Sequence, residues 1–177
     1  MKLISLWEPW ATLMAVGAKR IETRSWGTSY RGWLAIQASK AGLPKHRLAT
    51  FLDQPAFRLA LSGERLSPGC IVAVVRLLDC CPMQDFSYLS QTGVFSVYPE
   101  LDTQQEREFG DFSKGRWAWV TEDLVRLPKP IPFRAKQGLV DLPFETVTEL
   151  RNQCAQLSAQ FENSHRESKT EEAGING

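Results

Sequence analysis

The order of hydrophobic and polar positions near the N-terminus predicts a short helix between a proline and a glycine. Trp10, Leu13 and Met14 recur at positions i, i+3 and i+4, which places them on one face of a helix. Pro9 suits a first helical turn, because the backbone N–H that proline lacks has no partner there in any helix. Gly17 suits the left-handed conformation that often follows the last helical residue. The helix is therefore expected to end at this glycine.

Strands are expected where apolar and polar residues alternate, or where an apolar run lies between turn residues. The expected strands cover residues 2–6, 19–24, 32–36, 70–78, 115–120 and 133–140. The run at 70–78 is the most hydrophobic of them, so it should be central and buried on both faces. A helical segment interrupted at Pro55 is expected over 44–61, after the third strand.

The remaining stretches define the expected domain organisation. No period persists over residues 81–114, which predicts an extended surface excursion. A sustained apolar stripe predicts a long C-terminal helix over 143–162, which packs on the barrel or on a protein partner. The polar residues 163–177 are expected to form a disordered tail. We therefore predict one domain over residues 1–162.

The fold class follows from the number and order of these elements. Five or six short strands with few helices, and no regular alternation of strand and helix, favour an α+β protein built on a small, closed mixed β-barrel. The short first helix follows the first strand and would plug one side of the barrel. We expect the helical segment after the third strand to cover a barrel opening.

Composition and cysteine usage narrow the function classes. The chain has 177 residues, of which 43% are hydrophobic and 23% charged, as in ordinary soluble globular proteins. It has no long apolar run that would suggest a membrane span, and no secretory signal, so a cytoplasmic monomer or weak dimer is expected. Four cysteines without a CxxC pair, and two histidines, favour reduced thiols with no metal and no cofactor.

Cations and aromatic rings gather in the N-terminal quarter of the chain. Residues 6–40 hold four of the six tryptophans, and in residues 1–41 six basic side chains face two acidic ones. Cations suit phosphates and flat rings suit bases, so this stretch favours binding of single-stranded RNA or of a modified nucleotide. The candidate binding residues are Trp7, Trp10, Lys19, Glu22, Arg24, Trp26, Arg31, Lys40 and Arg116.

Several of these residues have alternative roles that the sequence leaves open. Glu22 and Arg24 lie on one side of the expected strand, so they form either a structural ion pair or part of a site. Lys19 could bind a phosphate or act as a base with a lowered pKa. If the protein is an enzyme, the catalytic candidates are Lys19, Glu22 and Tyr30. Trp10 could equally be a core residue.

Residues 17–24, GAKRIETR, match the GxKxxExR signature of the ASCH domain (activating signal cointegrator homology), a family of the PUA-like superfamily. Further similar blocks follow in the family's order over about residues 2–142: PWA at 9–11, an RSW…RG…I…K run over 24–40, and the later strands at 69–80, 115–119 and 137–139. The resemblance implies a PUA-like β-barrel with a cleft beside the first helix that holds RNA or a nucleotide.

The same resemblance implies a hydrolase as the alternative function. A bacterial branch that resembles this fold hydrolyses N4-acylated cytidine, and other relatives are ribonucleases. That branch has a lysine used as a base at the position of Lys19, but a threonine where this chain has Glu22. Many family members also have histidine where this chain has Gln37. These departures favour binding over hydrolysis.

Overall fold

A computed structural model describes residues 1–83 and 94–155 of the chain. The chain divides into two compact units, Met1–Asp141 and Leu142–Gly177, and each is described by itself. The candidate site lies wholly within the first unit.

The first unit is built on one mixed six-stranded sheet with the strand order β2-β5-β4-β3-β1-β6. Its strands are β1 (Lys2–Leu6), β2 (Ile21–Arg24), β3 (Gly32–Ala38), β4 (Cys70–Pro82), β5 (Trp117–Pro132) and β6 (Leu139–Asp141). β1 and β3 run parallel, and the other neighbouring pairs are antiparallel. The predicted central position of the apolar run at 70–78 is confirmed, because it forms most of β4 and lies between β5 and β3.

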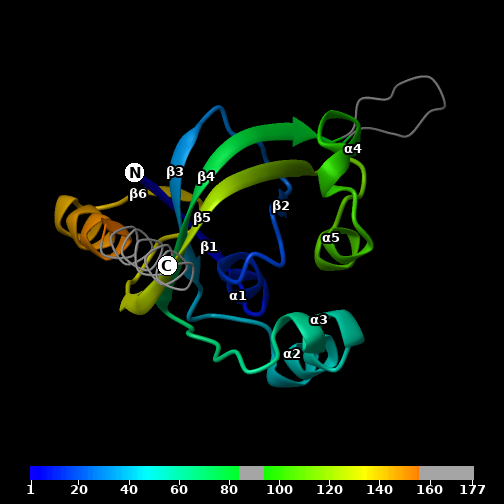
Figure 1. Cartoon of the computed structure of the whole chain (residues 1–177), viewed down its shortest axis with the longest axis horizontal. Helices are drawn as coiled ribbons and strands as arrows, with labels where there is room; N and C mark the ends of the chain where they lie inside the picture. The colour runs from blue at the N-terminus through cyan, green and yellow to red at the C-terminus, as the bar shows by residue number, and fades with distance from the viewer. Residues whose placement is uncertain (84–93, 156–177) are drawn as a thin grey trace, which may run out of the picture. The chain divides into compact units, whose positions relative to one another are not determined.

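The predicted α+β architecture with a barrel-like sheet is confirmed, but the barrel is not closed. Figure 1 shows β4 and β5 as long, curved strands that bend the sheet into a half-barrel. Among the described strands, β2 and β6 each pair on one side only and form the two ends of the sheet. The region 133–140, predicted as a closing strand, is extended only from Leu139 onward.

Helix α1 (Trp10–Ala15) lies inside the curve of these strands (Figure 1). Its Ala11, Met14 and Ala15 are buried in one apolar cluster with inward-facing residues of β1, β3, β4 and β5. The helix ends as the sequence predicted, at Gly17 with a φ of 77°. Because this short helix fills the curve, it fixes the position of the cleft residues that flank it.

The helical segment predicted over 44–61 is confirmed as two helices, which pack beside α1. These are α2 (Lys45–Leu52) and α3 (Pro55–Ala60), with Pro55 in the first turn of α3. Phe57 of α3 is buried and contacts the ring of Trp10, with the centroids 6.4 Å apart. Phe51 of α2 lies 4.9 Å from the same indole, edge to face. This aromatic cluster supports one wall of the cleft.

The segment predicted as a surface excursion is folded and partly buried in its described part. It contains α4 (Val94–Val97), a 3-10 turn η1 (Pro99–Leu101) and α5 (Gln104–Phe109). Val94, Phe95, Leu101 and Phe109 are buried. The prediction of an irregular surface loop was wrong because these apolar residues are separated by short turns and show no period. Their burial holds α5 against the start of β2.

In the second unit, residues 144–155 are helical, in agreement with the predicted C-terminal helix. The end of that predicted helix, and the predicted tail at 163–177, lie outside the described residues. A protein partner on this helix, and a domain boundary at 162, remain predictions. Throughout the part of the chain that the structure describes, no helix is long and apolar enough to cross a membrane.

Candidate functional site

Two adjoining hollows form a cleft in the first unit. They share Ser5, Trp7, Arg24, Trp26 and Gln137. The larger, of about 580 Å³, is also lined by Trp10, Glu22, Thr23, Phe51, Phe109, Asp111 and Arg116, and we call it the aromatic lobe. The smaller, of about 350 Å³, is also lined by Ser39, Ala135, Lys136 and Gly138, and we call it the basic lobe. The cleft therefore brings together six of the predicted site residues: Trp7, Trp10, Glu22, Arg24, Trp26 and Arg116.

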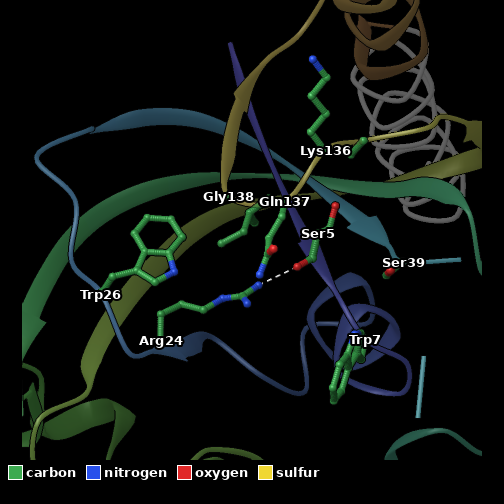
Figure 2. Close-up of a pocket in the computed structure, with 10 residues that line it drawn as sticks. Ser5, Trp7, Arg24, Trp26, Ser39, Lys136, Gln137 and Gly138 are labelled. Atoms are coloured by element: carbon green, nitrogen blue, oxygen red, sulfur yellow. Dashed lines mark hydrogen bonds between the residues drawn. The ribbon is translucent and has the colours of Figure 1, made fainter. Parts of the chain in front are cut away.

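Arg24 lies where the two lobes meet. Strand alternation in β2 places its side chain beside Glu22, with Arg24 Nε 3.1 Å from Glu22 Oε1. Its Nη2 donates to the main-chain oxygen of Ser5 on β1, at 2.6 Å. Figure 2 shows the guanidinium reaching across the pocket toward Ser5 and Gln137. The predicted pairing of the two charges is thus confirmed. Among the described residues Nη1 of Arg24 donates no hydrogen bond, so the guanidinium keeps N–H groups that can bind a ligand.

The tryptophans of the cleft differ in how firmly they are held. Trp26 packs edge to face on the buried Trp119, with ring centroids 4.8 Å apart. Trp119 Nε1 also donates to the main-chain oxygen of Trp26, at 3.2 Å. Trp10 is half-buried, and its Nε1 donates to the oxygen of Phe109, at 2.9 Å. Trp7 is 53% exposed, so its ring is available for stacking with a ligand.

Asp111 and Arg116, which also line the aromatic lobe, are tied to β2 through Thr23. The backbone N–H of Asp111 donates to Thr23 Oγ1 at 3.2 Å, and Arg116 Nη2 donates to the Thr23 carbonyl oxygen at 3.0 Å. Arg116 Nε lies 3.3 Å from Asp111 Oδ2. Hydrogen bonds from Ser113 and the charge of Arg116 lower the pKa of Asp111, so this part of the lining carries a carboxylate at neutral pH.

The basic lobe is formed largely by a segment that the sequence did not single out as a site. Gln137 points toward Arg24 and Ser5, whereas Lys136 extends away from them at the rim (Figure 2). Beneath the lobe, Ser5 Oγ donates to Gln37 Oε1 at 2.5 Å, and Gln37 Nε2 donates to the Phe133 oxygen. This buried network anchors the 133–138 segment to β1 and β3. The sequence signals for this segment were the strand expected over 133–140 and the family-like block at 137–139, and neither was assigned to the site.

Lys19 is buried away from the cleft. Its side chain is 1% exposed, and Nζ donates to the Ile21 carbonyl oxygen and lies 3.7 Å from Glu106 Oε1. Burial lowers the pKa of Lys19, against the opposing charges of Glu22 and Glu106. Lys19 lines a separate hollow of about 190 Å³, which shares no lining residue with the two lobes. The structure therefore gives this lysine a structural position.

The lowered pKa of Lys19 predicts a measurable pH dependence of stability. The folded protein releases this proton at a lower pH than the unfolded chain, whose lysine has an ordinary pKa near 10.5. Between these two pKa values the unfolded state binds more protons, so the contribution of Lys19 to stability should increase as pH rises. Lys19→Met should remove this contribution. Urea titrations of both proteins from pH 7 to 10 measure it, and parallel pH profiles would contradict the prediction.

Three other predicted residues also lie outside the two lobes. Tyr30 donates its hydroxyl hydrogen to the Trp33 oxygen at 2.7 Å, and Arg31 Nη2 pairs with Asp79 Oδ1 at 2.7 Å. Lys40 is exposed, with its stem near Gly69. The catalytic candidates Lys19, Glu22 and Tyr30 thus share no cavity of the described structure.

None of the four cysteines forms a disulfide in the described structure. Burial raises the pKa of Cys81 to about 12, so its thiol is protonated at neutral pH. No group of three or more His, Cys, Asp or Glu side chains within the described ranges could hold a metal ion. The cleft offers instead stacking rings, guanidinium donors and carboxylate acceptors.

The geometry defines an α+β half-barrel with an aromatic, charged cleft between β1, β2 and the segment before β6. The model of the ASCH domain family matches residues 4–120, which include the end of β1, all of β2 to β4 and the beginning of β5. The chain therefore belongs to the ASCH domain family.

Individual relatives are similar over most of this chain. It is 32% identical over 151 residues to Activating signal cointegrator 1 of Homo sapiens and 30% identical over 149 residues to that of Mus musculus. Each match covers 77% of this chain but 24% of the relative, so the chain spans about a quarter of their length. A crystal structure of ASCH from Zymomonas mobilis has a TM-score of 0.49 and 17% identity, covering 85% of this chain and 93% of that one.

Proposed function

We propose that the cleft binds single-stranded RNA or a nucleotide. The observation that carries this proposal is the position of Arg24, whose guanidinium lies at the junction of both lobes between Trp7 and Trp26. A planar cation beside one exposed ring, Trp7, and one half-buried ring, Trp26, suits a ligand that combines phosphates with flat bases. Membership of the ASCH family supports the same class of ligand.

The structure favours some candidate residues over others for this role. Trp7 would stack on a base, Arg24 would contact phosphate or a base edge, and Glu22 would accept hydrogen bonds from a base. Arg116 would act from the part of the lining that is tied to Thr23. A cytoplasmic protein that is a monomer or weak dimer belongs to the same proposal, and size-exclusion chromatography with and without RNA tests the oligomeric state.

Trp7→Ala should weaken binding of single-stranded RNA by about 1–3 kcal/mol, because one base loses its stacking partner. The dependence of affinity on salt should not change, since no charge is removed. Fluorescence anisotropy with a mixed-sequence labelled oligonucleotide, at several salt concentrations, measures both quantities. Trp33→Ala is the matched control, because Trp33 is 43% exposed but lies outside both lobes.

Arg24→Ala gives the complementary result. Affinity should fall, and the slope of log affinity against log salt should decrease by about one unit if the guanidinium contacts a phosphate. Lys45→Ala removes an exposed cation of α2, outside the cleft, and should leave affinity and slope close to wild type. Equal effects of Arg24→Ala and Lys45→Ala would contradict a specific cleft, and no binding at low salt would refute the proposed function.

A hydrolase remains the second candidate because of one observation, the lowered pKa of Lys19 near the charge of Glu22. A lysine with a lowered pKa is more often in the neutral form that can act as a base or nucleophile near neutral pH. However, Lys19 is buried and contacts Ile21 and Glu106, so a substrate could not reach it in this conformation. Incubation with RNA and with N4-acetylcytidine tests the idea: turnover that is lost in Lys19→Met, with RNA binding retained, would establish it.

A further inference from the structure

We infer, on the basis of the proposed function, that the cleft binds a nucleotide in one orientation and reads one feature of its base. The phosphate lies toward the basic lobe. The base lies in the aromatic lobe, with an amino group on its Watson–Crick edge donating to Glu22. The ligand class is therefore a nucleotide whose base carries such an amino group.

The orientation follows from how charge divides between the lobes. The aromatic lobe has three carboxylates, Glu22, Glu108 and Asp111, against Arg24 and Arg116. The lining of the basic lobe contains two cations, Arg24 and Lys136, and no acidic residue. A phosphate is thus favoured in the basic lobe and repelled by the carboxylates of the other. Because Arg24 lines both lobes, it can contact the phosphate from the junction.

The shape and surface of the aromatic lobe suit a base. Its volume of about 580 Å³ exceeds the 350 Å³ of the basic lobe, and its lining includes the aromatic residues Trp7, Trp10 and Phe51, none of which is fully buried. Flat apolar rings stack on bases of any sequence, so they supply affinity without choosing among bases. A choice requires a hydrogen-bonding group, and Glu22 lies in the lining of this lobe and not of the other.

Glu22 retains an acceptor for such a contact. Its Oε1 faces Arg24 Nε at 3.1 Å, whereas Oε2 accepts no hydrogen bond within the described structure. The side chain is 13% exposed, so a ligand that enters the lobe would remove what remains of its solvation. Such a carboxylate oxygen needs a donor in the complex, or the complex loses the free energy of an unpaired acceptor.

The need for a donor predicts discrimination between otherwise similar bases. Cytosine presents an amino group to a carboxylate, the pairing that carboxylates make with this base in DNA recognition. Uracil has a carbonyl oxygen at the same position, and two acceptors facing each other repel. Cytidine and uridine monophosphates have the same size and phosphate charge, so they isolate this contact.

The first arm of the test measures the affinities of these two nucleotides by isothermal titration. Wild type should bind cytidine 5′-monophosphate at least about fivefold more tightly than uridine 5′-monophosphate. Glu22→Gln has an amide that can donate as well as accept, so the ratio should fall to about one. Melting temperatures of both proteins show whether the variant is folded. If the variant does not fold, the ratio of the two wild-type affinities still tests the inference.

The second arm tests the orientation. Lys136→Ala should weaken the binding of cytidine 5′-monophosphate by about 2- to 5-fold, the range for an exposed charge pair. The affinity for cytidine, which has no phosphate, should not change. Lys45→Ala should change neither. An equal loss for nucleotide and nucleoside in Lys136→Ala would place the phosphate elsewhere and overturn the orientation.

The inference and the proposed function fail in different ways. The inference is overturned if wild type binds the two monophosphates with equal affinity, or if Glu22→Gln leaves the ratio of their affinities unchanged. Either result would mean that Glu22 does not recognise an amino group of the base, and RNA binding in the cleft would stand. No binding of mixed single-stranded RNA at low salt refutes the proposed function, and with it the inference.

Discussion

Glu106→Ala is expected to lower the free energy of unfolding by about 3–5 kcal/mol, the cost of removing one partner from a buried ion pair. The carboxylate of Glu106 accepts the backbone N–H of Arg20 at 2.8 Å and that of Ile21 at 2.9 Å. It also lies 3.7 Å from Nζ of the buried Lys19. The substitution leaves two N–H groups without acceptors and an ammonium group without its counter-charge. Urea denaturation followed by tryptophan fluorescence measures the loss.

Two further variants separate this mechanism from a general weakening of α5. Glu108→Ala removes an exposed carboxylate from the same helix and should cost little. The double variant Glu106→Ala, Lys19→Met should recover part of the loss, because no unpaired charge remains buried. A double variant less stable than Glu106→Ala alone would show that the ion pair is not the cause.

The contact between Glu106 and β2 is also an example of a contact that could not be predicted from the sequence. The alternation in β2 correctly paired Glu22 with Arg24, because strand periodicity is a local property. Lys19 was expected to face a ligand, since a lysine without a known partner is usually exposed. Its actual partner lies 87 positions away, in a segment whose short helices have no readable period. No local pattern connects the two residues.

The sequence predicted those parts of the candidate site that depend on local patterns along the chain. Trp7, Trp10, Glu22, Arg24 and Trp26 come from one stretch around α1 and β2, and the structure brings them into one cleft. The segments that complete the cleft, 108–111 and 135–138, reach it only through long-range folding. Their polar and glycine-containing sequences resemble ordinary loops. Arg31 and Lys40, chosen for their charge and nearness in sequence, lie outside both lobes, because Arg31 pairs with Asp79 and the exposed Lys40 lies beside Gly69, although its neighbour Ser39 lines the basic lobe.

Trp119→Ala is expected to lower the free energy of unfolding by about 3–5 kcal/mol, the usual cost of truncating a buried tryptophan. Trp119 is fully buried in the cluster that α1 completes, and it supports Trp26 through ring contact and a hydrogen bond of 3.2 Å. The substitution leaves a cavity inside the half-barrel and frees the Trp26 carbonyl oxygen. Since domains of this size are stable by about 5–15 kcal/mol, the loss is a large part of the total. Thermal and urea denaturation give the value.

Trp119→Phe and Trp33→Ala test whether this tryptophan links stability to the cleft. Trp119→Phe keeps an aromatic ring under Trp26 but removes the indole N–H, so it should destabilise less than alanine. Because Trp26 then loses the bond that fixes its backbone, RNA affinity should fall even in the folded variant. Trp33→Ala removes a tryptophan that is 43% exposed and should change neither stability nor affinity by much. A folded Trp119→Phe protein with unchanged RNA affinity would show that Trp26 needs no such support, or that it does not contact the ligand.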